Sequence, residues 1–437
     1  MKTKDLTTFQ VSILKEFGNH VNKISRLEIA CVFLLVVSIL LGIWGLWKQI
    51  TIGHGVTGMR DNIVWGHYIS SFIYFIGVSY GGAILAAALY YFKIEWGKPI
   101  IRIATLMAFI TGIIGPVFIL LCIGRFDRLH YLFIYARVQS PITWDVMVIS
   151  TYLVGITLFL YLLLIKDFSI LSTTDVIKKP NWKQKIYQFL TIGYSGNDKQ
   201  EALIDKSTRS VAFVIIPKVT LAFAVLSWIF GMTLRPGWHS TIFGPTFVIS
   251  SIATSLALII ILMWFYRKWY GLKEFITDRQ FEYLGYIMLF LIVIYGYFTF
   301  SEYITVWYSS GEWETAGMQK LFNLDEFGWA FHLSNFFGIV FPILIIGVRK
   351  LRTPNAITAM SLLLVVAIWV RRYLTVVPTL ENTLLPMQET RPEYAEYTAT
   401  MVEWFLVFAG ASTFILFAIL IPKIINIIPI SSYKFKT

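Results

Sequence analysis

The sequence predicts an all-α polytopic membrane protein with about ten transmembrane helices. Of its 437 residues, 57% are hydrophobic and only 14% are charged, and the mean hydropathy is +0.68. A soluble protein of this size carries roughly 25% charged residues. Several apolar runs have a length of about 20 residues, which is what a helix needs to cross a bilayer. The short alternating strands typical of a membrane barrel are absent from the pattern.

The apolar runs give the expected order of the elements. We expect spans at about 27–47, 63–92, 100–122, 142–165, 210–234, 242–266, 281–308, 327–348, 356–378 and 401–421. Similar motifs open the second span, Trp65-Gly66-His67, and the sixth span, Trp238-His239. This repeat predicts that spans 2–5 and spans 6–9 form two four-helix bundles, with spans 1 and 10 as flanking helices.

Five segments follow from this order. They are a cytoplasmic N-terminal segment at 1–26, the first helix with an outer loop at 27–61, the first bundle at 62–234 including a cytoplasmic loop at 166–209, the second bundle at 235–378, and an outer loop, last helix and cytoplasmic tail at 379–437.

Positive charge predicts the orientation. The polar segments on one side of the spans hold 26 of the 37 Lys and Arg residues, and those on the other side hold 8. Because cytoplasmic loops are the basic ones, both termini are predicted to be cytoplasmic, in the plasma membrane of a prokaryote. The basic residues flank apolar spans and form no continuous stripe, which argues against nucleic acid as a partner.

The stretch 122–145, between the third and fourth spans, holds the first candidate site. Ser140-Pro141 is typical of a helix cap and first turn, so Asp145 is expected one turn inside a helix, near the outer membrane surface. Arg125 and Asp145 could meet there as a hydrogen-bonded pair. The pair could be a structural salt bridge, or it could form the polar end of a site for a lipid-soluble, proton-exchanging ligand such as a quinone.

Other polar residues within the spans are further candidates. Arg371 and Arg372 in the ninth span need acidic or polar partners, and Glu302 in the seventh span is the expected one. Lys218 either reaches the inner surface or belongs to a proton path. The candidates for hydrogen bonds to a quinone carbonyl are His67, Tyr68, Tyr80 and His239, each of which could instead be an ordinary interface residue.

The sequence encodes no evident redox centre. Its two cysteines, Cys31 and Cys122, lack the spacing of an iron–sulfur or zinc site. The six histidines include no evident facing pair within the spans that could bind haem. We therefore expect no haem, iron–sulfur cluster or metal in this chain.

Several motifs resemble one known family. They are Trp65-Gly66…Phe75…Gly77…Gly81-Gly82, Gly124-Arg125 followed by Ser140-Pro141…Trp144-Asp145, Pro236-Gly237-Trp238-His239-Ser240-Thr241-Ile242-Phe243, Glu302…Trp307-Tyr308-Ser309 and Arg372…Val376-Val377. Together they resemble the NrfD-type, or polysulfide-reductase membrane subunit, family. The ten-helix branch that includes the quinone-interacting subunits of alternative complex III is the most similar.

The resemblance implies two four-helix bundles and a quinone pocket near the outer face. It implies an adjacent ferredoxin-like iron–sulfur subunit, a further catalytic subunit, and no redox centre in this chain. Arg125 and Asp145 would lie near the quinone head group. Two positions depart from the family pattern: Cys122, which we count among the candidates for the quinone site, replaces a histidine that precedes the Gly-Arg pair, and Ile229 replaces an aspartate.

The leading hypothesis is a quinone-interacting subunit of a respiratory oxidoreductase complex. It would exchange electrons between a menaquinone-type substrate and the iron–sulfur partner, with possible proton translocation. A second hypothesis is a membrane anchor without quinone chemistry, and a third is a secondary transporter. The partner's substrate and the direction of electron flow stay open.

Overall fold

The computed structural model describes residues 11, 13–14, 25–174, 180–382 and 396–430. Within these ranges all regular structure is helical, and ten helices are long and apolar enough to cross a membrane. The predicted all-α polytopic fold with about ten spans is therefore confirmed. Most of the predicted segment 1–26 lies outside the described residues.

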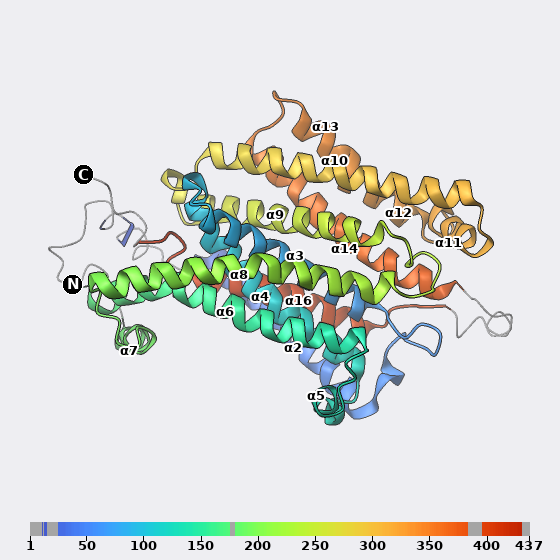
Figure 1. Ribbon diagram of the computed structural model, residues 1–437, viewed down its shortest axis with the longest axis horizontal. Helices are drawn as coiled ribbons and strands as arrows, with labels where there is room; N and C mark the ends of the chain where they lie inside the picture. Colours follow the sequence, from blue (N-terminus) through green and yellow to red (C-terminus); the bar gives the residue numbers. More distant parts are fainter. Residues whose placement is uncertain (1–10, 12, 15–24, 175–179, 383–395, 431–437) are drawn as a thin grey trace.

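Eight of the ten spans form two adjacent groups of four (Figure 1). Each helix of a group packs against its neighbours in a closed ring. The first group consists of α3 (His67–Tyr91), α4 (Lys98–Ile123), α6 (Pro141–Thr173) and α8 (Asp198–Gly231). The second group consists of α9 (Phe243–Trp269), α10 (Asp278–Ser309), the broken helix α12 and α13 (Gly328–Asn335 and Phe341–Gly347), and α14 (Pro354–Glu381). This packing agrees with the expected pairing of spans 2–5 and spans 6–9.

The remaining two spans pack against each other outside these groups. They are α2 (Arg26–Ile52) and α16 (Met401–Leu420), and α16 also contacts α3 and α4. Only 11% of the apolar stretch of α2 is buried, and its exposed side chains include Phe33 and Leu34. Such an apolar outer face is suited to a lipid environment.

Helix α3 forms the centre of the molecule. Its apolar stretch is 83% buried, the largest share among the ten spans. It contacts α9 and α14 of the second group as well as the helices of its own group. Gly77 and Gly81 face Ser251 and Ser255 of α9, where an added Cβ atom would collide with the serine hydroxyls. Small residues four apart thus allow the two groups to approach closely.

The predicted polar loop at 166–209 is largely helical, which corrects the boundaries expected from the sequence. Helix α6 continues to Thr173, α7 covers Asn181–Leu190, and α8 already begins at Asp198. Lys166 of α6 lies 2.6 Å from Asp205 of α8 and joins the two polar extensions. Hydropathy marks where the apolar stretch ends, whereas the backbone hydrogen bonds of a helix continue into the polar region.

The eighth span is interrupted. A π-helical turn at Phe336–Val340 separates α12 from α13, and Pro342, which lacks an N–H, follows it. The short helices α5 (Tyr131–Ile134) and α11 (Glu312–Phe322) lie at one end of the molecule, whereas α7 lies at the other (Figure 1). We call these the α5 end and the α7 end.

Candidate functional site

Asp145 is a buried carboxyl group near the start of α6, at the α5 end. Pro141 occupies the first turn of the helix, where its missing N–H removes no helical hydrogen bond. Ser140 precedes it, although its hydroxyl accepts no hydrogen bond from the helix, contrary to the predicted cap. Asp145 is only 3% exposed, and its Oδ1 has no partner among the described residues. A buried polar atom without a hydrogen-bond partner destabilises the fold by about 1–3 kcal/mol. A ligand or a water molecule could supply the missing hydrogen bond.

Arg125 does not pair with Asp145, which corrects the expectation from the sequence. Gly124 ends α4 in the left-handed region with φ 69°. The Arg125 guanidinium then lies 2.9 Å from the Asp127 carboxylate, and these side chains are 62% and 60% exposed. Their hydrogen bond lowers the pKa of Asp127 below its ordinary value. A partner two residues away in the same turn thus competes successfully with one twenty residues away.

Tyr80 lies in the middle of α3 and is fully buried. Its hydroxyl has no hydrogen-bond partner among the described residues. Its ring packs edge-on against Tyr152, with 4.8 Å between centroids. The Tyr152 hydroxyl shares a 2.6 Å hydrogen bond with Ser79. Of the predicted residues, Asp145 and Tyr80 are therefore both buried within the first group of helices, each with a side-chain oxygen that has no partner among the described residues.

His67 begins α3 within an aromatic cage. Its ring lies 5.6 Å from Trp369, 4.8 Å from Tyr373 and 4.4 Å from Trp404, measured between centroids. The side chain is buried, and its Nδ1 has no hydrogen-bond partner in the part of the chain that the structure describes. Its backbone N–H donates to the Tyr397 hydroxyl at 3.0 Å. The predicted candidate is thus surrounded by α14 and α16 rather than by the Asp145 region.

Glu403 is a second buried carboxyl group, and the sequence pattern did not indicate it as a candidate. Its Oε1 accepts a 2.6 Å hydrogen bond from the Tyr397 hydroxyl, and its Oε2 accepts bonds from the backbone N–H groups of Gly58 and Thr400. In the sequence, Thr400 and Glu403 indicate only a capping box at a helix start. The bond to Gly58, 345 residues away, is visible only in the tertiary structure.

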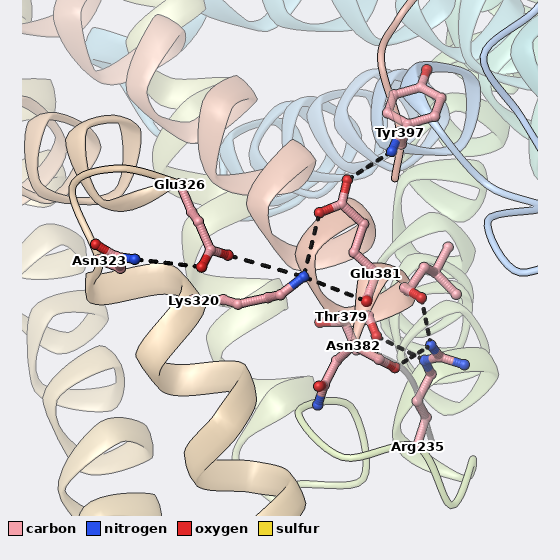
Figure 2. A network of polar contacts seen from close by, with 9 residues as sticks. Arg235, Lys320, Asn323, Glu326, Thr379, Glu381, Asn382 and Tyr397 are labelled. Carbon is pink, nitrogen blue, oxygen red and sulfur yellow. Dashed lines mark hydrogen bonds and ion pairs between the residues drawn. The ribbon is translucent and has the colours of Figure 1, made fainter. Parts of the chain in front are cut away.

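A polar network continues from Tyr397 into the second group of helices (Figure 2). The backbone N–H of Tyr397 donates to Glu381 at 2.9 Å, and the Lys320 ammonium lies 3.8 Å from the same carboxylate and 4.0 Å from Glu326. The Arg235 guanidinium donates to the last carbonyl groups of α14 and the residue after it, those of Thr379, Leu380 and Asn382. The network therefore fixes the end of α14 at the α5 end.

Tyr68 and Cys122 lie beside α2. The Tyr68 hydroxyl donates to Gln49 at 2.8 Å, and the Gln49 amide donates to the carbonyl of Leu121 at 2.7 Å. The Cys122 thiol donates to the carbonyl of Val64 at 3.7 Å. These contacts join α2, α3 and α4, so both predicted residues have structural partners.

Arg371 and Arg372 have different partners, although they are adjacent in α14. Arg371 lies 3.8 Å from Glu302 and donates to the Tyr303 hydroxyl at 2.7 Å, as the sequence predicted for one arginine of the pair. Arg372 pairs instead with neutral groups of α9, namely the hydroxyls of Ser250 and Ser251, the Phe247 carbonyl and the face of the Phe247 ring. Successive residues project about 100° apart on a helix, so one acid cannot serve both.

A narrow cavity of about 90 Å³ lies beside this arginine pair. Its walls come from α9, α10, α11 and α14, and they include Glu302, Arg371 and Arg372. The second group of helices therefore has its own polar cavity, separate from Asp145.

His239 lies at the edge of this cavity, because its partner Glu314 lines it, whereas Lys218 lies outside the residues that line it. The His239 side chain is 44% exposed, and its Nε2 lies 3.1 Å from Glu314 of α11. Lys218 is partly exposed on α8. The repeat noted in the sequence nevertheless has a structural counterpart, because the rings of Trp65 and Trp238 stack 5.7 Å apart where α3 and α9 begin.

The family model that describes NrfD, the polysulphide reductase family, matches residues 55–384. This range includes both groups of four helices. The chain belongs to this family. The family resemblance predicted from the motifs is therefore confirmed, and the protein is a multi-pass membrane protein.

Three relatives are similar to this NrfD-family chain. A protein of Halobacterium salinarum, provisionally named as the membrane subunit of a dimethyl sulfoxide reductase, is 27% identical over 59% of this chain, but the match covers only 54% of that protein. A selenate reductase subunit of Mesobacillus selenatarsenatis is 24% identical over 71% of this chain and 73% of its own. The Hdr-like menaquinol oxidoreductase integral membrane subunit of Archaeoglobus fulgidus is 23% identical over 86% of this chain and 88% of its own.

Proposed function

We propose that this chain is the quinone-interacting membrane subunit of a multisubunit oxidoreductase. The observation that carries the proposal is that Asp145 and Tyr80, both buried in the first group of helices, have an Oδ1 atom and a hydroxyl that lack partners among the described residues. A quinone head group supplies what these atoms lack, since it offers oxygen atoms that accept hydrogen bonds and, in the quinol, hydroxyl groups that donate them.

The two residues have different roles, one toward the quinol and one toward the quinone. Asp145 accepts a proton from a quinol hydroxyl, while the Tyr80 hydroxyl donates a hydrogen bond to a quinone oxygen. Oxidation of one quinol releases two protons and two electrons, and the reverse reaction takes up the same number. The two electrons pass to or from an iron–sulfur subunit bound at the α5 end. Arg125 has no part in holding Asp145, because its guanidinium bonds to Asp127.

The names of the relatives support two parts of the proposal, membership of an oxidoreductase complex and a menaquinone-type substrate. Each of the three is named as a subunit of a reductase or an oxidoreductase, and the Archaeoglobus protein is named for menaquinol. A menaquinone-type substrate is therefore the one we propose. The excess of Lys and Arg in the segments of the α7 end supports a cytoplasmic α7 end and an outer α5 end.

The α5 end offers a surface for the partner. The segment between α4 and α6 exposes apolar side chains, with exposed fractions of 66% for Phe133, 67% for Ile134 and 69% for Tyr135. Arginines at 125, 128 and 137 flank them. A contiguous apolar patch with a charged rim is typical of a protein interface.

The Asp145→Asn variant of the assembled complex tests the proposal. The amide keeps the size of the side chain but accepts no proton, so we expect quinol-dependent turnover to fall roughly 100-fold, within the usual range for general acid–base groups. The matched control is Asp325→Asn, an exposed acid at the same end and outside the segment that carries the proposed partner surface, which should turn over like the wild type.

Assembly of the complex is checked in parallel by co-purification of the partner subunits. Unchanged quinol turnover by an assembled Asp145→Asn complex would contradict the quinone role and favour a membrane anchor. Solute flux through the purified chain in vesicles, without any partner, would favour a secondary transporter instead.

A further inference from the structure

A large cavity lies at the α7 end, far from Asp145. Its volume is about 840 Å³, and it lies between the last turn of α3, the first turn of α4, α6 and the early part of α8. Helix α4 runs from Lys98 at this cavity to Ile123 at the α5 end, a length of roughly 39 Å at 1.5 Å per residue. The cavity is thus at the opposite end of the helices from the Asp145 region.

Three cations line this cavity without an ion pair among the described residues. They are Lys93, Lys206 and Arg209. The two acids of the cavity wall already have other partners, since Glu95 lies 2.5 Å from Lys98 and Asp205 lies 2.6 Å from Lys166. The cavity therefore keeps an excess of positive charge, which is suited to an anion.

Two local features distinguish the surroundings of these cations. Lys93 follows α3 in the left-handed region, with φ 55°, which is uncommon for a residue with a side chain. The Arg209 guanidinium lies 5.2 Å above the ring of Tyr91.

The deeper wall is apolar and open to the membrane. Phe213 and Val214 of α8 both line the cavity, and each is 56% exposed. They lie four and five residues beyond Arg209, about 6–7.5 Å further along the helix toward the middle of the span. A molecule in this cavity therefore meets positive charge at the end of the bundle and an apolar, open surface below it.

A buried arginine forms part of the same wall. Arg102 is 2% exposed and donates to Asp167 at 2.6 Å and to the carbonyl of Asn426 at 2.7 Å. Its Nε has no partner in the part of the chain that the structure describes. The Asp167 carboxylate compensates the charge of Arg102, so the wall behind the three cations adds no net charge but is held rigidly by these bonds.

We propose that this cavity binds an anionic phospholipid. Its phosphate group lies among Lys93, Lys206 and Arg209, and its acyl chains extend along Phe213 and Val214. A lipid without net charge lacks the negative charge that three cations favour. A free phosphate ion has no apolar part that could pack against the apolar wall. The site is independent of quinone exchange, because it lies at the other end of the helices.

Native mass spectrometry of the detergent-purified complex tests this proposal. The probes are dioleoyl phosphatidylglycerol, dioleoyl phosphatidylcholine and inorganic phosphate, each added after delipidation. We expect phosphatidylglycerol to be retained at least tenfold more strongly than phosphatidylcholine. The variant Lys93→Gln/Lys206→Gln/Arg209→Gln should lose this preference.

The matched control is Lys185→Gln/Lys268→Gln/Lys273→Gln, which removes three positive charges at the same end but outside the cavity. The control should retain phosphatidylglycerol like the wild type. The double variant Lys206→Gln/Arg209→Gln, which alters only exposed side chains, gives a second measurement if the triple variant does not fold.

Three outcomes would overturn the proposal. They are equal retention of the two lipids by the wild type, undiminished retention of phosphatidylglycerol by the double variant, and binding of inorganic phosphate as strong as that of phosphatidylglycerol. The last outcome would assign the cavity to a free anion.

Discussion

At the scale of single residues, two buried carboxyl groups at the α5 end differ in their environment. The oxygens of Glu403 accept hydrogen bonds from Tyr397, Gly58 and Thr400. The Oδ1 of Asp145 has no partner among the described residues. A fully bonded carboxylate stabilises the fold, whereas an unsatisfied one is available for a ligand. This difference is why Asp145, and not Glu403, is assigned to the proposed quinone site.

The hydrogen bond between Tyr397 and Glu403 is expected to contribute to the free energy of unfolding. Burial and the Glu403 carboxylate raise the pKa of Tyr397, so its hydroxyl stays protonated and donates at physiological pH. Tyr397→Phe leaves a buried Glu403 oxygen and the His67 N–H unpaired, so we expect the free energy of unfolding to fall by about 1–3 kcal/mol. Thermal unfolding of the purified protein measures this. Tyr308→Phe, on a side chain that is 84% exposed, is the control and should melt like the wild type.

At the scale of elements, one buried ion pair joins three segments at the α7 end. Arg102 of α4 donates to Asp167 of α6, and both side chains are 2% exposed. Arg102 also donates to the carbonyl of Asn426, and Asp167 accepts from the N–H of Ile430. The segment after α16 is therefore attached to the first group of helices through this pair.

Removal of one partner should be costly. Arg102→Met leaves the Asp167 charge buried without its cation, so we expect a loss of about 3–5 kcal/mol in the free energy of unfolding. The double variant Arg102→Met/Asp167→Leu should recover most of this loss, and Arg125→Gln, in an exposed pair, should leave the melting temperature unchanged. A double variant as unstable as the single one would contradict the assignment of the cost to an unpaired charge.

At the scale of the whole molecule, the two groups of helices meet where α3 packs on α9. A Cβ atom at Gly77 would lie 2.7 Å from the Ser251 hydroxyl, and one at Gly81 would lie 3.0 Å from the Cα atom of Ile252. A side chain at Gly81, whose Cβ atom would also lie 2.2 Å from the Ser255 hydroxyl and 2.9 Å from the Ser255 Cβ atom, would require α9 to shift. The distance between the groups is thus set by two glycines four residues apart on α3.

Gly81→Leu should force the two groups apart. Overpacking of a close interface costs typically about 1–3 kcal/mol, so we expect a lower melting temperature for the purified protein. Gly155→Leu is the control, because no atom lies within 4 Å of a Cβ added at this helical glycine of α6. Equal melting temperatures for the two variants would show that the α3–α9 contact does not determine stability.

Orientation and partner binding can be measured together. In a background with Cys31 and Cys122 replaced by serine, we expect a membrane-impermeant maleimide to label Tyr135→Cys in intact cells when the chain is expressed alone. Assembly with the proposed iron–sulfur partner should protect this cysteine. Lys185→Cys at the α7 end should be labelled only after lysis. Labelling of Lys185→Cys in intact cells would reverse the proposed orientation.

The sequence by itself determined the fold class, the ten spans and the family. Apolar runs long enough to cross a bilayer are a local property, and so are the family motifs, including the one that places Asp145 near a helix start. Agreement with the structure was weaker at 166–209, because hydropathy marks the membrane edge there and the helices continue beyond it.

Only the tertiary structure decided which polar residues meet. In the structure Arg125 pairs with Asp127 rather than with Asp145, and Arg371 and Arg372 have different partners. The structure also revealed Glu403, whose bond to Gly58 crosses 345 residues. The physical reason is that a hydrogen bond depends on distances of about 3 Å between side chains of different helices, and the packing of those helices, not the spacing along the chain, sets such distances.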